Sequence, residues 1–107
     1  MTQKNLFENI PQEIPDEIFE VLVSNPGVTI ERIVSKGHCS PDNFWYDQER
    51  NEWVLLLQGH ARVQFFEEAT VALQPGDCIT IPAHCKHRVA WTDPDEETIW
   101  LAVFYPD

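Results

Sequence analysis

The segment LQPGDCITIPAHCKHRV, residues 73–89, places two turns and two short strands in succession. The first turn is the Pro-Gly-Asp sequence at 75–77, and the second begins at Pro82. A proline fixes its own backbone angle and cannot donate a ladder hydrogen bond. We therefore expect one strand to end at Ile81 and the next to begin near Lys86.

The two histidines of this segment cannot share a face of one regular strand, because successive side chains on a strand point to opposite faces. His87, Val89 and Trp91 have the same parity, and two of the three are apolar. This pattern predicts that His87 points into the core, with Trp91 on the same face. His84 then belongs to the turn that Pro82 starts, and points away from the core.

The composition is that of one folded domain over residues 1–107, with 43% hydrophobic side chains and no low-complexity tract. Seven Lys and Arg against 18 Asp and Glu give a net charge of −11, which argues against nucleic acid as a partner. The longest apolar run, residues 99–105, is too short to cross a bilayer, and the N-terminus lacks the features of a signal peptide. We expect a cytoplasmic protein with no membrane partner.

The N-terminal part predicts the one helix of the chain. In IPDEIFEVLVSNPG, residues 14–27, Pro15 suits a first helical turn and the acidic residues after it suit the positive end of a helix. The SNPG sequence at 24–27 is expected to end this helix.

From Val28 onward, short segments rich in β-branched and aromatic residues alternate with turn sequences. Strands are expected near residues 28–35, 44–48, 52–58, 60–66, 69–74, 78–81, 86–91 and 98–104. Short and evenly spaced strands of this kind predict an all-β, antiparallel sandwich or barrel. We therefore divide the chain into an N-terminal extension with a helix, 1–27, and a β-barrel, 28–107.

Five residues at fixed spacing resemble the two sequence motifs of the cupin family of small β-barrels. Gly76, Pro82 and His87 match the second motif, which is Gly, five residues, Pro-x-Gly-x-x-His, with His84 in place of the middle glycine. Glu52 and Gly59 match the end of the first motif, which is His-x-His, three or four residues, Glu, six residues, Gly. The resemblance implies a cupin double-stranded β-helix, an antiparallel jelly-roll barrel.

The resemblance also implies a metal site, which this chain carries in altered form. Cupins typically bind divalent iron, manganese, nickel, copper or zinc through three histidines and a glutamate. Here the two histidines of the first motif are replaced by Tyr46 and Gln48, so the expected ligands are Gln48, Glu52, His87 and Tyr46. An amide carbonyl and a phenol are weaker ligands than imidazole. The carbonyl is a neutral, hard ligand, and the phenol must lose its proton to bind well.

Three functions remain open at this point. A metal-dependent enzyme would use the open positions of a site built on Glu52 and His87. A metal-free enzyme would use Glu52 and His87 as a general acid and base, with Tyr46 as a donor. A metal-free module would bind or sense a small molecule without turnover.

We also expect a ligand pocket and a homodimer. We expect Tyr46 and Trp91 to line a ligand pocket beside the motif residues, because Trp91 has the parity of His87. The partner is a small-molecule ligand. Small cupins usually pair, and a homodimer would give this short chain more buried surface.

Overall fold

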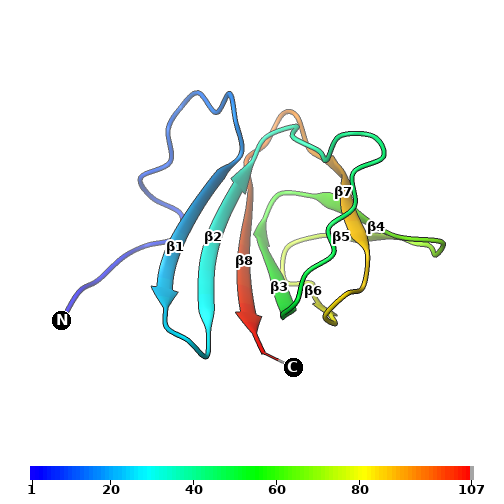
Figure 1. The fold of residues 1–107 in the computed structure, drawn as a ribbon. Coiled ribbons are helices and arrows are strands. Elements are labelled where there is room, and N and C mark those ends of the chain that lie inside the picture. Colours follow the sequence, from blue (N-terminus) through cyan, green and yellow to red (C-terminus); the bar gives the residue numbers. More distant parts are fainter. Residues whose placement is uncertain (107) are drawn as a thin grey trace.

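The computed structural model describes residues 1–106 as two antiparallel β-sheets that face each other (Figure 1). The strands are β1 (Ile18–Ser24), β2 (Thr29–Ser35), β3 (Asn51–Gln58), β4 (Ala61–Phe65), β5 (Thr70–Leu73), β6 (Cys78–Ile81), β7 (His87–Thr92) and β8 (Thr98–Tyr105). The larger sheet has the order β1-β2-β8-β3-β6, and the smaller has the order β5-β4-β7. The all-β architecture that the strand pattern predicts is confirmed.

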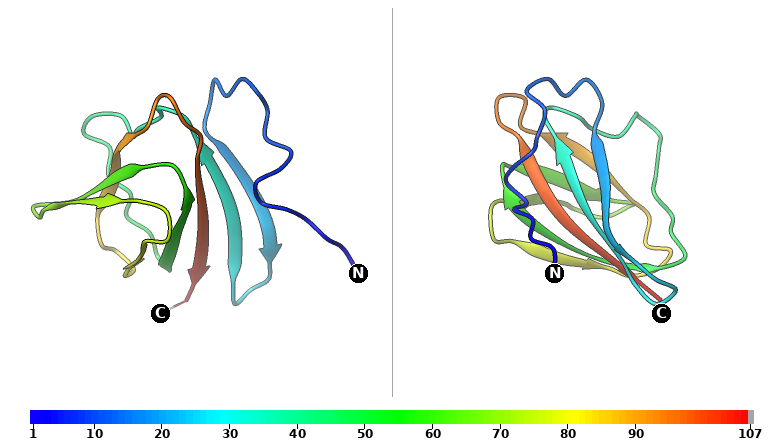
Figure 2. Two further views of the ribbon diagram at one scale, coloured as in Figure 1. Left: turned by 180° about the vertical axis from the view of Figure 1, so that it is seen from behind. Right: turned by 90° about the vertical axis from the view of Figure 1, so that its left-hand side faces the viewer.

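The core lies between the sheets because their strands alternate apolar inward and mixed outward side chains. On β3, Val54 and Leu56 are buried, while Trp53 and Leu55, which alternate with them, are only partly buried. The buried cluster consists of Val54, Leu56, Ala61, Val63, Leu73, Trp100 and Ala102. Strands β1 and β2 extend beyond the edge of the smaller sheet, which is clear from the front and from behind (Figures 1 and 2).

The prediction of an N-terminal helix is wrong. Residues 1–106 contain no helix, and Ile18–Ser24 form the edge strand β1. The strand pairs antiparallel with β2, with Phe19 opposite Ile33 and Val21 opposite Glu31. The β-branched residues of this segment fit a strand better than a helix, and pairing with an available neighbour outweighs the local helix signals.

The prediction of a strand at 44–48 is also wrong. This segment is part of the connection between β2 and β3, and it contains a single isolated bridge between Tyr46 and His87. Two backbone hydrogen bonds form that bridge, Tyr46 N to His87 O at 2.7 Å and His87 N to Tyr46 O at 3.2 Å. The connection is therefore fixed at the position where it meets β7.

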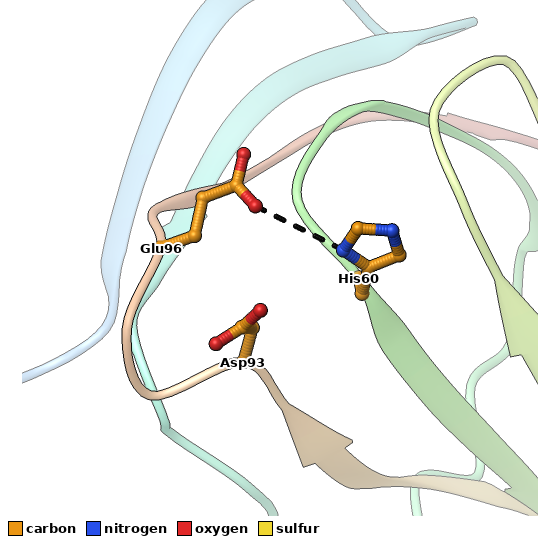
Figure 3. Close-up of side chains that lie close together, drawn as sticks. All are labelled: His60, Asp93 and Glu96. Carbon is orange, nitrogen blue, oxygen red and sulfur yellow. Dashed lines mark ion pairs between the residues drawn. The ribbon is translucent and has the colours of Figure 1, made fainter.

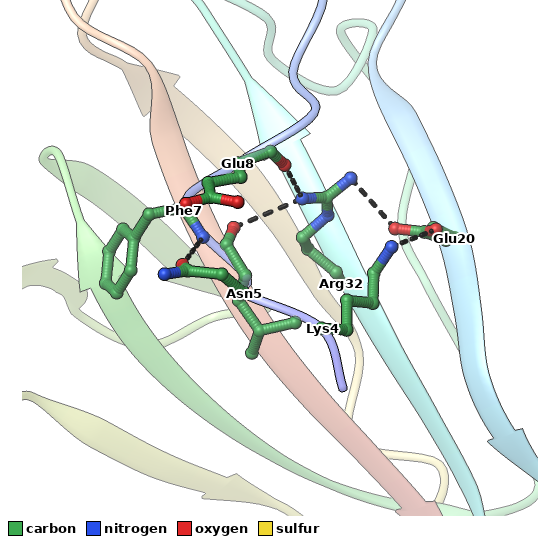
Figure 4. Close-up of polar contacts among 7 residues, drawn as sticks. Lys4, Asn5, Phe7, Glu8, Glu20 and Arg32 are labelled. Carbon is green, nitrogen blue, oxygen red and sulfur yellow. Dashed lines mark hydrogen bonds and ion pairs between the residues drawn. The ribbon is translucent and has the colours of Figure 1, made fainter. Parts of the chain in front are cut away.

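A buried arginine attaches the N-terminal arm, residues 4–8, to the outer face of the larger sheet (Figure 4). Arg32 on β2 is only 4% exposed, and its Nη1 donates to the backbone carbonyls of Leu6 at 3.1 Å and Glu8 at 2.8 Å. Its Nη2 lies 2.8 Å from Glu20 Oε1 on β1. The hydrogen bond from Lys4 and the charge of Arg32 lower the pKa of Glu20, against the opposite effect of burial.

Over the part of the chain that the structure describes, no helix is long and apolar enough to span a membrane.

Candidate functional site

A cavity of about 90 Å³ lies between the two sheets and reaches Tyr46, Gln48, Glu52 and His87. The structure thus brings these four sequence-predicted residues together. Glu52 comes from β3, His87 from the start of β7, and the other two from the connection before β3. Their polar groups meet aliphatic walls, which include Val54, Val63, Ile79, Ile81 and Val89.

Glu52, Gln48 and His87 form a connected polar group. Gln48 Nε2 donates to Glu52 Oε1 at 2.9 Å, and His87 Nε2 lies 3.7 Å from the same oxygen. The residues Glu52 and His87 are 7% and 5% exposed, so water provides little solvation for either. Burial of this kind strengthens the interaction between the two groups.

The backbone fixes the orientation of the His87 ring. His87 Nδ1 lies 2.9 Å from the carbonyl oxygen of Cys85, which can only accept, so Nδ1 carries the hydrogen. In the neutral imidazole this leaves the lone pair on Nε2, the atom that faces Glu52. Nε2 is therefore available to accept a proton or to bind a metal.

Tyr46 packs its ring against His87, with centroids 5.4 Å apart and the planes inclined by 25°. Burial raises the pKa of the Tyr46 phenol, and the negative charges of Glu17 and Glu52 raise it further. The phenol therefore keeps its proton at neutral pH. It can donate a hydrogen bond to a ligand, but it does not offer a phenolate.

The structure does not bring Trp91 to the cavity. A register shift interrupts the pairing of β4 with β7, so that Val63 pairs with Val89 and Arg62 with Trp91. The extra residue, Ala90, reverses the parity of the residues after it. Trp91 therefore lies on the other face of the sheet, where the Arg62 guanidinium carbon is 5.0 Å from its ring centroid. The next residue, Thr92, is buried instead.

His84 points away from the cavity, as its parity and turn position predict. Its Nδ1 is 2.8 Å from Asp47 Oδ1, and its side chain is 66% exposed. The φ angle of 62° places His84 in the left-handed region. A glycine would adopt this conformation more readily, which explains why the family motif has one at this position.

Sequence reasoning missed two further acidic residues of the cavity, Glu17 and Glu31. Glu17 accepts a hydrogen bond from Ser35 Oγ, which itself accepts one from Trp100 Nε1 at 3.2 Å. Burial raises the pKa of Glu31, repulsion from Glu52 raises it further, and Arg50 acts in the opposite direction. The alternation of side chains along β2 could have identified Glu31, because Glu31 has the same parity as the apolar Ile33 and therefore lies on the same face.

A second group of metal-ligand type lies outside the cavity, where the β3–β4 turn meets the β7–β8 loop (Figure 3). One ligand atom from each of His60, Asp93 and Glu96 lies within 4.8 Å of the others. His60 Nδ1 is 3.8 Å from Glu96 Oε2, and the two side chains are 52% and 47% exposed. Both side chains are therefore in contact with solvent.

The comparisons with known proteins agree with the fold. The model of the cupin domain family matches residues 32–104. A solved structure from Ralstonia eutropha JMP134, a protein with the provisional name mannose-6-phosphate isomerase, is 45% identical, with a TM-score of 0.96 and coverage of 100% of both chains. A search of the curated proteins finds no match.

Two more distant structures share the fold alone. A cupin superfamily protein from Desulfitobacterium hafniense DCB-2 has 20% identity and a TM-score of 0.75, covering 92% of this chain and 84% of its own. An RmlC-like cupin with a double-stranded β-helix fold from Methanocaldococcus jannaschii has 16% identity and a TM-score of 0.72, covering 99% and 93%. Since the family model spans most of the chain and the Ralstonia protein matches it from end to end, this chain belongs to the cupin family.

Proposed function

We propose that the cavity binds a small metabolite, with Glu52 and His87 as the reactive or recognising pair at its polar end. The observation that carries this proposal is a buried carboxylate and a buried imidazole, 3.7 Å apart, in an otherwise mostly apolar cavity. Apolar cavities with a few convergent polar groups are typical small-molecule sites. Tyr46 supports the pair by packing against the imidazole and by offering its hydroxyl group as a donor.

The provisional name of the Ralstonia protein suggests an isomerase that acts on a sugar phosphate. A carboxylate beside an imidazole suits the proton transfers of an isomerase. However, a phosphate dianion needs cationic or backbone donors, and no described residue that lines this cavity is a lysine or an arginine. We therefore propose that the ligand carries no phosphate group.

The residues of the cavity fit a weakly held divalent metal, such as iron, nickel, manganese or zinc. His87 Nε2 and a Glu52 oxygen are strong ligands, and their separation of 3.7 Å is close to that of two ligands on one ion. Gln48 would have to turn its amide so that oxygen, not nitrogen, faces the ion. A metal bound there would polarise a ligand oxygen at its open positions.

The alternative function is a metal-free binding or sensing module. Two observations favour it: Gln48 directs an N–H group at Glu52, and the raised pKa of Tyr46 keeps the phenol protonated. In this arrangement Glu52 already has a hydrogen-bond donor and needs no ion. The same residues would then recognise a polar group of the ligand.

Metal analysis distinguishes these two functions. Tag-free protein, purified without a chelator, is expected to contain or take up one divalent ion, measured by elemental analysis and by calorimetric titration with Ni²⁺ and Zn²⁺. His87→Ala is expected to lower the affinity at least about 10- to 100-fold, since loss of a direct ligand costs at least as much as loss of an outer-shell partner.

His84→Ala is the matched control, because its exposed ring faces away from the cavity. Equal affinity of the parent and His87→Ala would show that the ion is bound elsewhere. If the parent takes up none of the ions, the metal-free module is the correct function.

We also propose that the chain forms a homodimer through β1. This edge strand exposes three large apolar side chains, Phe19, Val21 and Val23, at 56%, 58% and 46%. A row of this kind on an edge strand invites pairing with another strand. Val21→Lys is expected to convert the dimer to a monomer in sedimentation equilibrium, whereas Phe7→Lys, on the arm, is expected to leave it unchanged. A monomeric parent protein would contradict this assembly.

The cytoplasm is the location that we propose. The cysteines Cys39, Cys78 and Cys85 are all free thiols, and two of them are exposed. Exposed free thiols persist in a reducing compartment.

A further inference from the structure

The cavity combines acidic and aromatic side chains in a way that its proposed function does not by itself explain. Three carboxyl groups line it, those of Glu17, Glu31 and Glu52. Four aromatic rings line it as well, those of Phe19, Tyr46, Trp100 and Phe104. Among residues 1–106, no lysine or arginine side chain forms part of the lining.

The sheet register places two of the carboxyl groups, those of Glu31 and Glu52, on the two strands that flank β8. Glu31 on β2 pairs with Ala102 on β8, and Ala102 pairs in turn with Val54 on β3. Glu52 lies two positions before Val54 on the same strand and therefore on the same face. Glu52 itself pairs with Phe104, so the two carboxyl groups lie diagonally across β8, with Ala102 and Phe104 between them. Burial raises the pKa of Glu31, and repulsion from Glu52 raises it further.

The buried charge of Glu52 lacks a strong cationic partner. Its carboxylate receives one neutral amide donor, Gln48, and has the His87 imidazole at 3.7 Å. A buried carboxylate with so little compensation is costly. A positively charged ligand would offset that cost, and an anionic ligand would increase it.

One arginine lies near the cavity but does not neutralise it. Arg50 Nη1 donates to Thr29 Oγ1 at 2.8 Å, and the guanidinium carbon lies 5.3 Å from the ring centroid of Phe104. Its positive charge lowers the pKa of Glu31. A single cation held outside the lining leaves an excess of negative charge among the three carboxyl groups.

We propose that the ligand of this cavity is a small organic cation, a protonated amine with an apolar body. The ammonium group binds between Glu31 and Glu52, in a cavity whose lining also includes the rings of Tyr46 and Phe104. The apolar body packs against Phe19 and the aliphatic walls. This inference rests on the proposed small-molecule function and specifies the class of its ligand.

A charge series of equal shape tests the inference. Cyclohexylamine, cyclohexanol and cyclohexanecarboxylate are titrated into ¹⁵N-labelled full-length protein at pH 7, with EDTA present so that no metal competes. Amide shifts of Tyr46, Glu52 and His87 report binding in the cavity. We expect cyclohexylamine to bind at least about tenfold more tightly than cyclohexanol, a difference of about 1.4 kcal/mol, and the carboxylate to bind most weakly.

Glu31→Gln, which keeps the shape of the side chain, is expected to remove most of the preference for cyclohexylamine over cyclohexanol. Glu96→Gln is the matched control, because it removes the same charge from an exposed loop.

The outcomes separate the two levels of the proposal. Cyclohexanol binding without a preference for the amine would overturn the cationic ligand and retain the small-molecule site. No shift at the cavity with any of the three compounds would overturn both.

Discussion

Gly59→Ala is expected to reduce the free energy of unfolding by about 4 kcal/mol, from positive-φ strain and overpacking together. Gly59 forms the β3–β4 turn with a φ angle of 89°. A Cβ atom there would lie 2.6 Å from Thr98 Cα and 2.9 Å from the Glu97 carbonyl oxygen. Both contacts are with backbone, so the β7–β8 loop would have to move.

Gly76→Ala is the matched control for this prediction. Gly76 also has a positive φ angle, 95°, but a Cβ atom there would have no neighbour within 4 Å. Alanine at this position has the conformational strain without the steric clash. We expect the free energy of unfolding to fall by about 1 kcal/mol. Urea denaturation at 25 °C measures the free energy of unfolding of both variants. The dependence of that free energy on urea concentration is compared with that of the parent to confirm two-state unfolding. Equal losses would show that strain alone accounts for the requirement for glycine at residue 59.

Arg32→Ala is expected to cost about 3 kcal/mol of stability, because it removes two hydrogen bonds from a charged donor and the packing of a buried side chain. The substitution leaves Glu20 without its buried partner, and it removes the donor for the carbonyls of Leu6 and Glu8. The N-terminal arm should then leave the sheet. Urea denaturation gives the loss of stability, and limited chymotrypsin digestion should cleave after Phe7 much faster than in the parent protein.

Lys4→Ala is the control for the arm. Its amino group also contacts Glu20, at 2.9 Å, but the Lys4 side chain is 39% exposed. Exposed ion pairs contribute roughly 0–1 kcal/mol, so this variant should stay close to the parent in both measurements. A similar loss in the two variants would indicate that the charge of Glu20, and not the carbonyl contacts of Arg32, holds the arm.

The barrel could be predicted from sequence because its turns have local chemical requirements. Gly59 and Gly76 both have positive φ angles, and Pro82 follows directly on the end of β6. Spacing between such residues limits the length of the strands between them and predicts an antiparallel sandwich or barrel. The cupin fold itself follows from the motif resemblance, and the family match confirms it.

The N-terminal strand could not be predicted in this way. Pro15 and the acidic residues after it favour a helix locally, whereas β1 exists because β2 offers a partner for Ile18–Ser24. Pairing of this kind depends on tertiary context, which overrides weak local propensity.

The candidate site was predictable to the extent that its strands are regular. Parity predicts that His87 points inward and the motif resemblance predicts Glu52 as a site residue, and both residues line the cavity. Parity fails at Trp91 because a bulge at Ala90 leaves no mark in the sequence. Glu17 and Glu31 reach the cavity through β1 and β2, whose arrangement depends on the rest of the sheet.

The central position of β8 affects how the chain folds during synthesis. Strands β1 and β2 pair with each other, as do β3 and β6, but β8 provides the hydrogen bonds that join these pairs into one sheet. Until Thr98–Tyr105 has been synthesised, the β1–β2 hairpin and the β3–β6 pair each have an open edge where β8 will pair. The barrel therefore cannot close gradually from the N-terminus, and its formation depends on contacts that are distant in sequence, which fold slowly. Open edges also make the incomplete chain a natural target for chaperones.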